Sequence, residues 1–220
     1  MPSLSELTPA ERARLLSKPE GELGIALGET MNKTNANVIE AVYRRLGVRS
    51  GQSVLEIGFG NGHTVPLLMR QAEALTYVGV DISEMMVAEA GIFNRELMEA
   101  GRAVFHLASA EAIPCADASF DCAMAINVAY FWPDPVRVLA EIRRVLRPDG
   151  FSILAAGDPA TAAAWGRDEF GFRVRDADTL IRLHREAGFA AVTIEPYEEV
   201  ATRSDGVPRH RLYHFVIAHP

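Results

Sequence analysis

One short stretch constrains the fold of this chain more than any other. It is "VLEIGFGNG", residues 54–62, in which an apolar segment leads into three glycines spaced two residues apart. The residues that follow, 63–71, have the spacing of a helix. A strand that passes through a glycine loop into a helix directs backbone N–H groups and the positive helix end toward a ligand, and glycine permits φ > 0 and close approach. We therefore expect a ligand-binding turn here.

Short apolar runs alternate with helix-period segments from Val54 onward, the pattern of a parallel sheet with helices on both faces. Ser83 is suited to cap the second helix and Gly101 to end it. The strands are expected at 53–57, 76–81, 103–107, 120–126 and 150–156. The helices are expected at 63–71, 83–100 and 135–145. This rhythm predicts a doubly wound α/β fold.

The two ends of the chain differ from this central part. Residues 1–50 are expected to form a separate helical extension, with a turn and then a helix over 36–46, that folds over the site as a lid. The main domain is expected to span 51–220. A helix is predicted over 178–187, and two antiparallel strands on either side of Ser204-Asp205-Gly206.

Charge and composition narrow the functional classes. The 29 acidic and 22 basic residues give a net charge of −7, and the basic residues are scattered, which argues against a nucleic-acid partner. No segment reaches the roughly 20 apolar residues of a membrane span. Cys115 and Cys122 lack zinc-ligand spacing. We expect a cytoplasmic protein without a metal, monomeric or homodimeric, that acts on a small molecule.

Two carboxylates accompany the glycines and bear on the ligand. Asp81 ends the next predicted strand, where its carboxylate can accept hydrogen bonds from both hydroxyls of a ribose. Glu56 is costly beside a pyrophosphate, and a cationic or zwitterionic ligand tolerates it better. His63 stands where the dinucleotide fingerprint needs glycine or alanine. An NAD-dependent oxidoreductase is therefore the disfavoured alternative.

Several motifs resemble those of the class I S-adenosylmethionine-dependent methyltransferases, in particular the small-molecule branch with the ubiquinone and menaquinone C-methyltransferases. They are, in chain order, "VLEIGFGNG", "YVGVDISEMMVAEA", "ASAEAIPCADASFDCAMAINVAYFW" and "EIRRVLRPDGFSIL", and they cover about residues 50–156. The resemblance implies a Rossmann-like, mostly parallel seven-stranded sheet with an antiparallel last strand. It also implies methyl transfer from S-adenosylmethionine to a small organic acceptor, with S-adenosylhomocysteine as product. A non-enzymatic protein that binds the same cofactor is a further alternative.

The resemblance also implies the cofactor contacts. The glycines and Asn127 would lie along the methionine part, Asp81 would hold the ribose, and Glu56 would order the loop. The full expected set is Glu56, Gly58, Gly60, Gly62, Asp81, Ile82, Met86, Ser109, Ala110 and Asn127. Ile82 and Met86 would pack on the adenine, and Ala110 would offer it a backbone N–H. Ser109 departs from the family, which often has an acidic residue there, so we expect a weaker or rearranged adenine contact.

Aromatic side chains after the fourth strand predict the acceptor site. Tyr130 and Trp132 follow that strand at the carboxyl edge of the sheet, where open α/β folds hold ligands. Met31 and Trp165 are expected to add further walls. Tyr130 and His63 are the only, and weak, candidates for a catalytic group, because His63 in the first turn of a helix is more often solvated or a cap.

Overall fold

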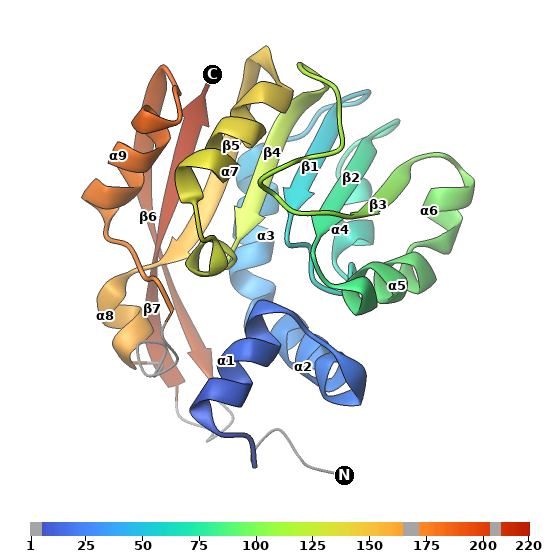
Figure 1. The fold of residues 1–220 in the computed structure, drawn as a ribbon. Helices are drawn as coiled ribbons and strands as arrows, with labels where there is room; N and C mark the ends of the chain where they lie inside the picture. The colour runs from blue at the N-terminus through green and yellow to red at the C-terminus, as the bar shows by residue number, and fades with distance from the viewer. Residues whose placement is uncertain (1–5, 165–171, 203–207) are drawn as a thin grey trace.

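The computed structural model describes residues 6–164, 172–202 and 208–220. In this part of the chain, the strands form a seven-stranded sheet in the order β3-β2-β1-β4-β5-β7-β6 (Figure 1). Their bounds are β1 Ser53–Ile57, β2 Thr76–Asp81, β3 Ala103–Leu107, β4 Phe120–Ile126, β5 Leu146–Gly157, β6 Ala191–Thr202 and β7 Pro208–His219. The pairs from β3 to β5 are parallel, and β7 runs antiparallel to both of its neighbours. The predicted Rossmann-like, doubly wound fold is confirmed.

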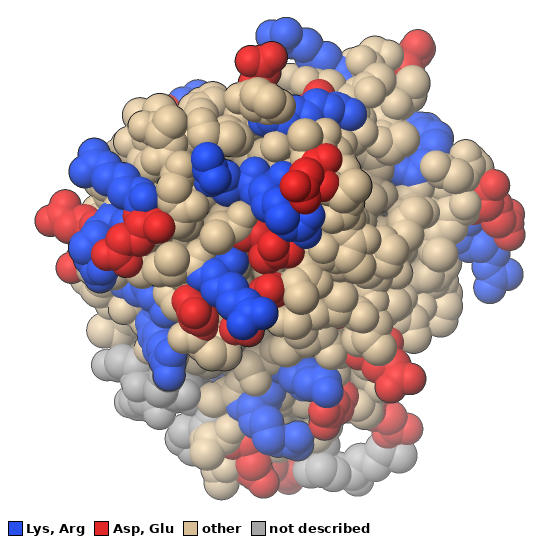
Figure 2. Space-filling model, turned by 45° about the horizontal axis from the view of Figure 1, so that its top comes forward, with Lys and Arg blue, Asp and Glu red and all other residues tan. Residues whose placement is uncertain are grey.

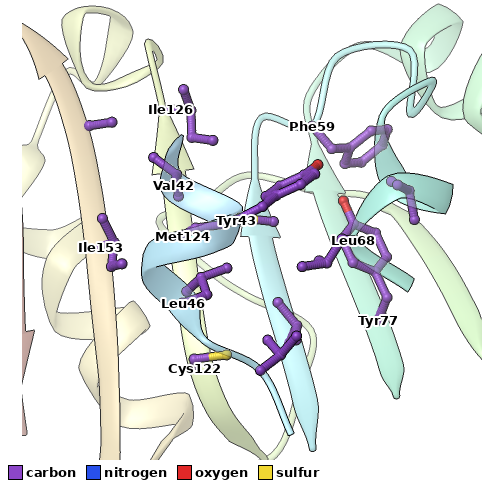
Figure 3. Packing of buried hydrophobic residues seen from close by; sticks show 14 of the residues in the cluster. Val42, Tyr43, Leu46, Phe59, Leu68, Tyr77, Cys122, Met124, Ile126 and Ile153 are labelled. Atoms are coloured by element: carbon purple, nitrogen blue, oxygen red, sulfur yellow. The ribbon is translucent and has the colours of Figure 1, made fainter. Parts of the chain in front are cut away.

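Helices cover both faces of this sheet. Alternation along β1 shows why, since Val54 packs into the cluster on one face and Leu55 into the cluster on the other. The first cluster includes residues of α3 (Ala36–Leu46), α4 (Val65–Met69) and α5 (Glu84–Phe93), and Figure 3 shows part of it. The second includes residues of α7 (Pro135–Val145) and α9 (Ala177–Glu186). The central strands are therefore buried on both sides, as in most parallel sheets.

The bounds of some predicted elements are corrected. The helix expected over 83–100 is two helices, α5 and α6 (Arg95–Glu99), that meet at Asn94. The Asn94 side-chain nitrogen donates to the carbonyls of Gly62 (3.0 Å) and Ala90 (2.9 Å), so a tertiary contact competes with the helical pattern. The helix expected over 63–71 shortens to α4. The fifth strand begins at Leu146, four residues early, because Leu146 pairs with Phe120 ahead of an irregular register.

The N-terminal region holds three helices, α1 (Pro9–Ser17), α2 (Gly21–Thr34) and α3. The turn predicted before α3 was wrong, because α2 occupies those residues. Val38 and Val42 on α3 are fully buried in the sheet core, so α3 belongs structurally to the main body. In Figure 1, α1 and α2 lie beyond the carboxyl ends of the central strands. The domain boundary at residue 50 stays a prediction.

Two short helical segments complete the fold, namely η1 (Ala129–Phe131) after β4 and α8 (Pro159–Ala164) after β5. On the face in Figure 2, basic and acidic side chains lie intermixed. No helix among the described residues is both long and apolar enough to cross a membrane. Within the same residues, no three His, Cys, Asp or Glu side chains gather as a metal site would require.

Candidate functional site

A cavity of about 360 Å³ lies at the carboxyl ends of β1, β2 and β4. Its walls come from the loops after these strands and after β3, and from the N-terminal helices. The strand order reverses between β1 and β4, and open α/β sheets bind ligands at this switch point. The volume is within the roughly 300–1,000 Å³ of small-molecule sites. Sheet topology therefore puts the cavity where a ligand is expected.

The three glycines of the loop after β1 have different roles. All have positive φ (+71°, +62° and +68° for Gly58, Gly60 and Gly62). A Cβ on Gly58 would stand 2.4 Å from a Val128 methyl, so Gly58 lets β1 and β4 approach. A Cβ on Gly60 would meet nothing within 4 Å, and Gly60 lines the cavity. Gly62 packs against Ala90 of α5 instead, so the structure does not bring it to the cavity wall.

Glu56 is a buried carboxyl group on the wall of this cavity. The Tyr77 hydroxyl donates a hydrogen bond of 2.7 Å to its Oε2. Burial raises the pKa of Glu56 to about 7 despite that bond, which favours the carboxylate, and the charge of Asp81 adds to the rise. A positive group bound near Glu56 would offset the cost of its buried charge.

Asp81 ends β2 and also lines the cavity. Burial raises its pKa to about 6, while backbone N–H groups, first that of Ser83, favour the ionised form. The Ser83 N–H donates to Asp81 Oδ1 at 2.8 Å. The Ser83 hydroxyl caps α5 by accepting from the Met86 N–H, and it donates to the Pro19 carbonyl at 2.6 Å. One residue thus positions Asp81 and ties the α1–α2 connection to α5.

The residues expected around the adenine all line the same cavity, namely Ile82, Met86, Ser109 and Ala110. Ile82 is about half exposed and Met86 is buried. Glu111 lines the cavity too, and its backbone N–H donates to the Ser109 hydroxyl. Ser109 stands where the family often has an acidic residue, and sequence reasoning gave Glu111 no role in the site.

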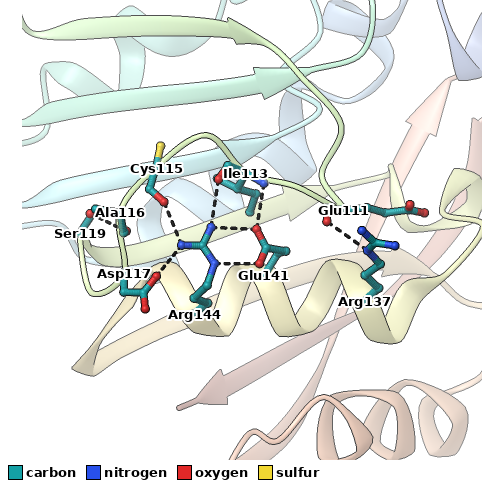
Figure 4. A network of polar contacts seen from close by, with 9 residues as sticks. All are labelled: Glu111, Ile113, Cys115, Ala116, Asp117, Ser119, Arg137, Glu141 and Arg144. Atoms are coloured by element: carbon teal, nitrogen blue, oxygen red, sulfur yellow. Dashed lines mark hydrogen bonds and ion pairs between the residues drawn. The ribbon is translucent and has the colours of Figure 1, made fainter.

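The loop after β3, which carries Ser109 and Ala110, is held to α7 by the guanidinium of Arg144 (Figure 4). Arg144 pairs with Asp117 of the loop and with Glu141 of its own helix. Arg144 forms two bonds with the Glu141 carboxylate, at 2.7 and 2.8 Å. Its guanidinium also donates to the carbonyls of Ile113 (3.0 Å) and Cys115 (2.9 Å). Glu141 in turn accepts from the Ile113 N–H at 3.0 Å. The planar fork of arginine satisfies several acceptors at once, so it fixes the loop geometry.

Asn127 follows β4 and lines the cavity in a left-handed conformation, with φ +57°. Its side chain bonds Asn35 from the N-terminal helices and the Tyr130 hydroxyl, both at 3.2 Å. Tyr130 itself is buried and is not part of the cavity wall. Its hydroxyl also accepts a hydrogen bond from the Gly157 N–H. The structure thus places Tyr130 behind Asn127.

The remaining predicted residues are distributed as follows. Met31 and Trp132 line the cavity, as does Phe131. Trp165 lies outside the described residues. His63 is exposed and does not line the cavity, and its ring packs edge-to-face with that of Phe93, with 5.3 Å between the ring centroids. The structure therefore brings Met31 and Trp132 to the cofactor residues and leaves His63 apart from them.

Sequence reasoning expected an N-terminal lid with Met31, but it did not single out the other residues of this region that line the cavity, namely Leu16, Ser17, Gly28, Asn32 and Asn35 at the end of α2. A signal for α1 was present. Thr8 and Glu11 have the spacing of a capping box, and the structure shows both of its hydrogen bonds. No comparable signal marks Asn35, whose position depends on how α2 meets the sheet.

Fold and site together define a Rossmann-like α/β protein with a ligand cavity at the topological switch point. Residues 55–154 match the family described as "Methyltransferase domain". This match covers slightly less than half of the chain, and residues 55–154 are thus similar to a methyltransferase domain of the class I, S-adenosylmethionine-dependent type. The placement of the chain in the quinone C-methyltransferase branch stays a prediction.

Among curated proteins, 27-O-demethylrifamycin SV methyltransferase of Amycolatopsis mediterranei is 33% identical over 59% of this chain and 46% of its own length. Methyltransferase GfsG of Streptomyces halstedii is 35% identical over 56% of this chain and 44% of its own length. The chain thus spans less than half the length of these relatives. The citrinin polyketide synthase CMeT domain has the same fold, with TM-score 0.70, 20% identity, and coverage of 94% of this chain and 59% of the other.

Proposed function

We propose that this protein transfers a methyl group from S-adenosylmethionine to a small organic acceptor. One observation carries the proposal, namely the electrostatic character of the cavity. Glu56, Asp81 and Glu111 line it, and none of the lining residues among those described is Lys, Arg or His. Such a wall suits a sulfonium and an ammonium group and disfavours the pyrophosphate of NAD. The open space at Gly60 and the Asp81 carboxylate fit the cofactor as the family resemblance implies.

The residues of the site would act mainly by alignment. Bound S-adenosylmethionine supplies an already activated methyl group. Asp81 would accept hydrogen bonds from the ribose hydroxyls, and Ile82 with Met86 would pack against the adenine. Asn127 would lie beside the methionine part. Holding cofactor and acceptor in line can account for most of the acceleration, because effective molarities reach about 10⁵–10⁸ M in well-oriented reactions.

We propose an oxygen as the acceptor atom, which the names of the relatives and the walls of the cavity support. Several relatives bear the name O-methyltransferase, and we extend that chemistry to this chain. The described wall offers no histidine or lysine to take a proton from an alcohol. A phenolic or enolic hydroxyl needs less help to ionise, so we propose an acceptor of that class, with Met31, Phe131 and Trp132 as its apolar contacts.

The setting of this activity is part of the proposal. The acidic net charge and the free Cys115 and Cys122 are consistent with a cytoplasmic enzyme that binds no nucleic acid. We take the active species to be a monomer or homodimer, with α1 and α2 as a lid over the cofactor.

Calorimetric titration tests the function directly. The protein should bind S-adenosylhomocysteine and should not bind NADH. Asp81→Asn removes the charged acceptor of the ribose hydrogen bonds and should weaken S-adenosylhomocysteine binding at least tenfold, because hydrogen bonds to charged groups contribute about 1.5–3 kcal/mol. Asp149→Asn, an exposed site with the same charge change, should have no effect. Binding of NADH without S-adenosylhomocysteine would overturn the proposal.

A further inference from the structure

A chain of four hydrogen-bonding groups crosses the wall of the cavity. It begins at the Gly157 N–H at the end of β5, which donates to the Tyr130 hydroxyl. The Tyr130 hydroxyl donates to Asn127 Oδ1, and Asn127 Nδ2 donates to Asn35 Oδ1. These residues come from β5, η1, the end of β4 and the start of α3. Three regions distant in sequence, at residues 35, 127–130 and 157, are thus connected in one buried network.

The direction of this network is set at its first member. A backbone N–H can only donate, so the Tyr130 oxygen accepts there and its proton is available for Asn127. Asn127 receives that proton at its oxygen, which leaves its nitrogen to donate to the oxygen of Asn35. The orientation of both amides follows, and the nitrogen of Asn35 is the last donor in the chain.

The Asn35 nitrogen is available to a ligand. Asn35 lines the cavity, and its side-chain nitrogen has no hydrogen-bond acceptor among the described residues. That nitrogen is not among the fully buried atoms that lack a partner, so it remains accessible. Asn35 therefore presents N–H groups to whatever occupies this part of the cavity, while its amide oxygen accepts from Asn127.

The position of the amide pair identifies the group it would meet. Val128, the residue after Asn127, lies against the glycine loop, because a Cβ on Gly58 would collide with its side chain. Gly28 of α2 lies over the same loop, where a Cβ would stand 3.5 Å from the Asn61 amide nitrogen. Glu56 lines the cavity from the strand before the loop. The loop is thus flanked by one anionic side chain and by two amide donors.

From this arrangement we infer that Asn35 and Asn127 bind the carboxylate of an α-amino acid head group, while Glu56 lies on the side of its ammonium group. The inference rests on the proposed function, since S-adenosylmethionine has such a head group. Donors with a fixed direction suit a carboxylate, which only accepts hydrogen bonds when ionised. Tyr130 is a positioning residue here, because it acts through Asn127.

Two ligands that differ only in the head group test the inference. S-adenosylhomocysteine carries the amino acid, and 5′-deoxy-5′-methylthioadenosine lacks it. Asn35→Asp keeps the acceptor for Asn127 and replaces the free donor by a negative oxygen. By calorimetry we expect at least a tenfold loss of S-adenosylhomocysteine affinity, while methylthioadenosine affinity changes less than twofold. Asn37→Asp, with the same charge change at an exposed position, is the matched control and should leave both affinities unchanged.

A neutral variant guards against a folding defect in the charged one. Asn35→Ala removes the donor without adding charge and should weaken S-adenosylhomocysteine several-fold and spare methylthioadenosine. Tyr130→Phe should show the same selectivity, more weakly, if it acts only by orienting Asn127. Equal losses for both ligands, or no loss for either, would overturn the inference and leave the proposed function intact. Failure of the unmodified protein to bind either ligand would overturn the proposed function itself.

Discussion

At the scale of single residues, Glu56 combines a structural cost with a role at the site. Its carboxyl group is buried, and its pKa is raised to about 7 from an ordinary value of 4.5. The folded protein therefore holds this proton more tightly than the unfolded chain does. Stability from this group is fully present below pH 4.5 and is lost as the pH rises through 7.

Glu56→Gln should remove this dependence on pH. The raised pKa of Glu56 means that the free energy of unfolding of the unmodified protein falls by about 3 kcal/mol between pH 4.5 and pH 8. Urea unfolding at several pH values measures it. Part of the dependence below pH 6 should persist in the variant, because the pKa of Asp81 is also raised, to about 6. An identical pH profile for both proteins would contradict the assignment.

Gly60 offers a second test at this scale. A control glycine with a similar φ but outside the cavity wall separates the effect of backbone strain from the effect of ligand contact. Gly60 and Gly101 both have left-handed φ, +62° and +67°, and a Cβ on either would meet nothing within 4 Å. Substitution of either glycine by alanine should lower the free energy of unfolding by about 1–2 kcal/mol. Only the Gly60 methyl group would enter the cavity. Calorimetry should therefore show at least a tenfold loss of S-adenosylhomocysteine affinity for Gly60→Ala, and equal affinities in the two variants would exclude close ligand contact at Gly60.

At the scale of elements, α1 can be tested separately from the core. It lines the cavity through Leu16 and Ser17, whereas α3 contributes Val38 and Val42 to the sheet core. A protein that lacks residues 1–18 should keep cooperative unfolding and bind S-adenosylhomocysteine several-fold more weakly, with faster dissociation. Stopped-flow binding measures this rate. Unchanged dissociation would exclude a lid role for α1, while removal of residues 1–50 would also delete α3 and so would not separate lid from core.

The Arg144 network should matter for both stability and the adenine end of the site. Arg144→Ala frees the carbonyls of Ile113 and Cys115 from α7 and should lower the free energy of unfolding by about 1–2 kcal/mol. It should also weaken binding of methylthioadenosine, because the loop carries Ser109 and Ala110. Arg143→Ala, an exposed neighbour on the same helix, is the control. A loss of stability without any loss of affinity would limit the network to a structural role.

At the scale of the whole molecule, the β6–β7 hairpin braces the N-terminal helices through a buried ion pair. Arg211 on β7 pairs with Glu199 on β6, and both side chains are almost fully buried. Arg211 also donates to the Thr34 carbonyl at the end of α2, at 2.6 Å, and lies over the Tyr213 ring. A cation at a helix C-terminus is favourable. The pair thus joins the last strands to the helix end next to Asn35.

Removal of one partner should therefore be costly. Arg211→Met leaves Glu199 buried without this partner and should lower the free energy of unfolding by about 3–5 kcal/mol. The double variant with Glu199→Met should recover much of that loss, since apolar replacements of buried pairs are often tolerated. The exposed pair of Arg45 and Glu195 is the control, and Arg45→Ala should cost at most about 1 kcal/mol. Urea unfolding measures all of them, and equal costs at the two pairs would contradict the bracing role.

Local patterns explain why much of the fold could be predicted. The bounds of β1 to β4, α3 and α7 matched the expected ranges, because each is an uninterrupted run of one periodicity. The break at Asn94 and the early start of β5 could not be predicted, since both depend on partners distant in sequence. The cofactor residues followed from strand ends and glycines, whereas α2 was missed because its glycines and amides resemble a turn.

The sequence by itself determined the doubly wound fold, the glycine loop and the carboxylates Glu56 and Asp81, because each depends on neighbouring residues or on the end of one strand. Only the tertiary structure decided that Gly62 packs against α5, that Tyr130 lies behind Asn127 and that Asn35 reaches the cavity. The physical reason is that a hydrogen-bond network needs groups from several elements within about 3 Å of each other. That proximity depends on how helices and strands pack, and no spacing along the chain encodes it.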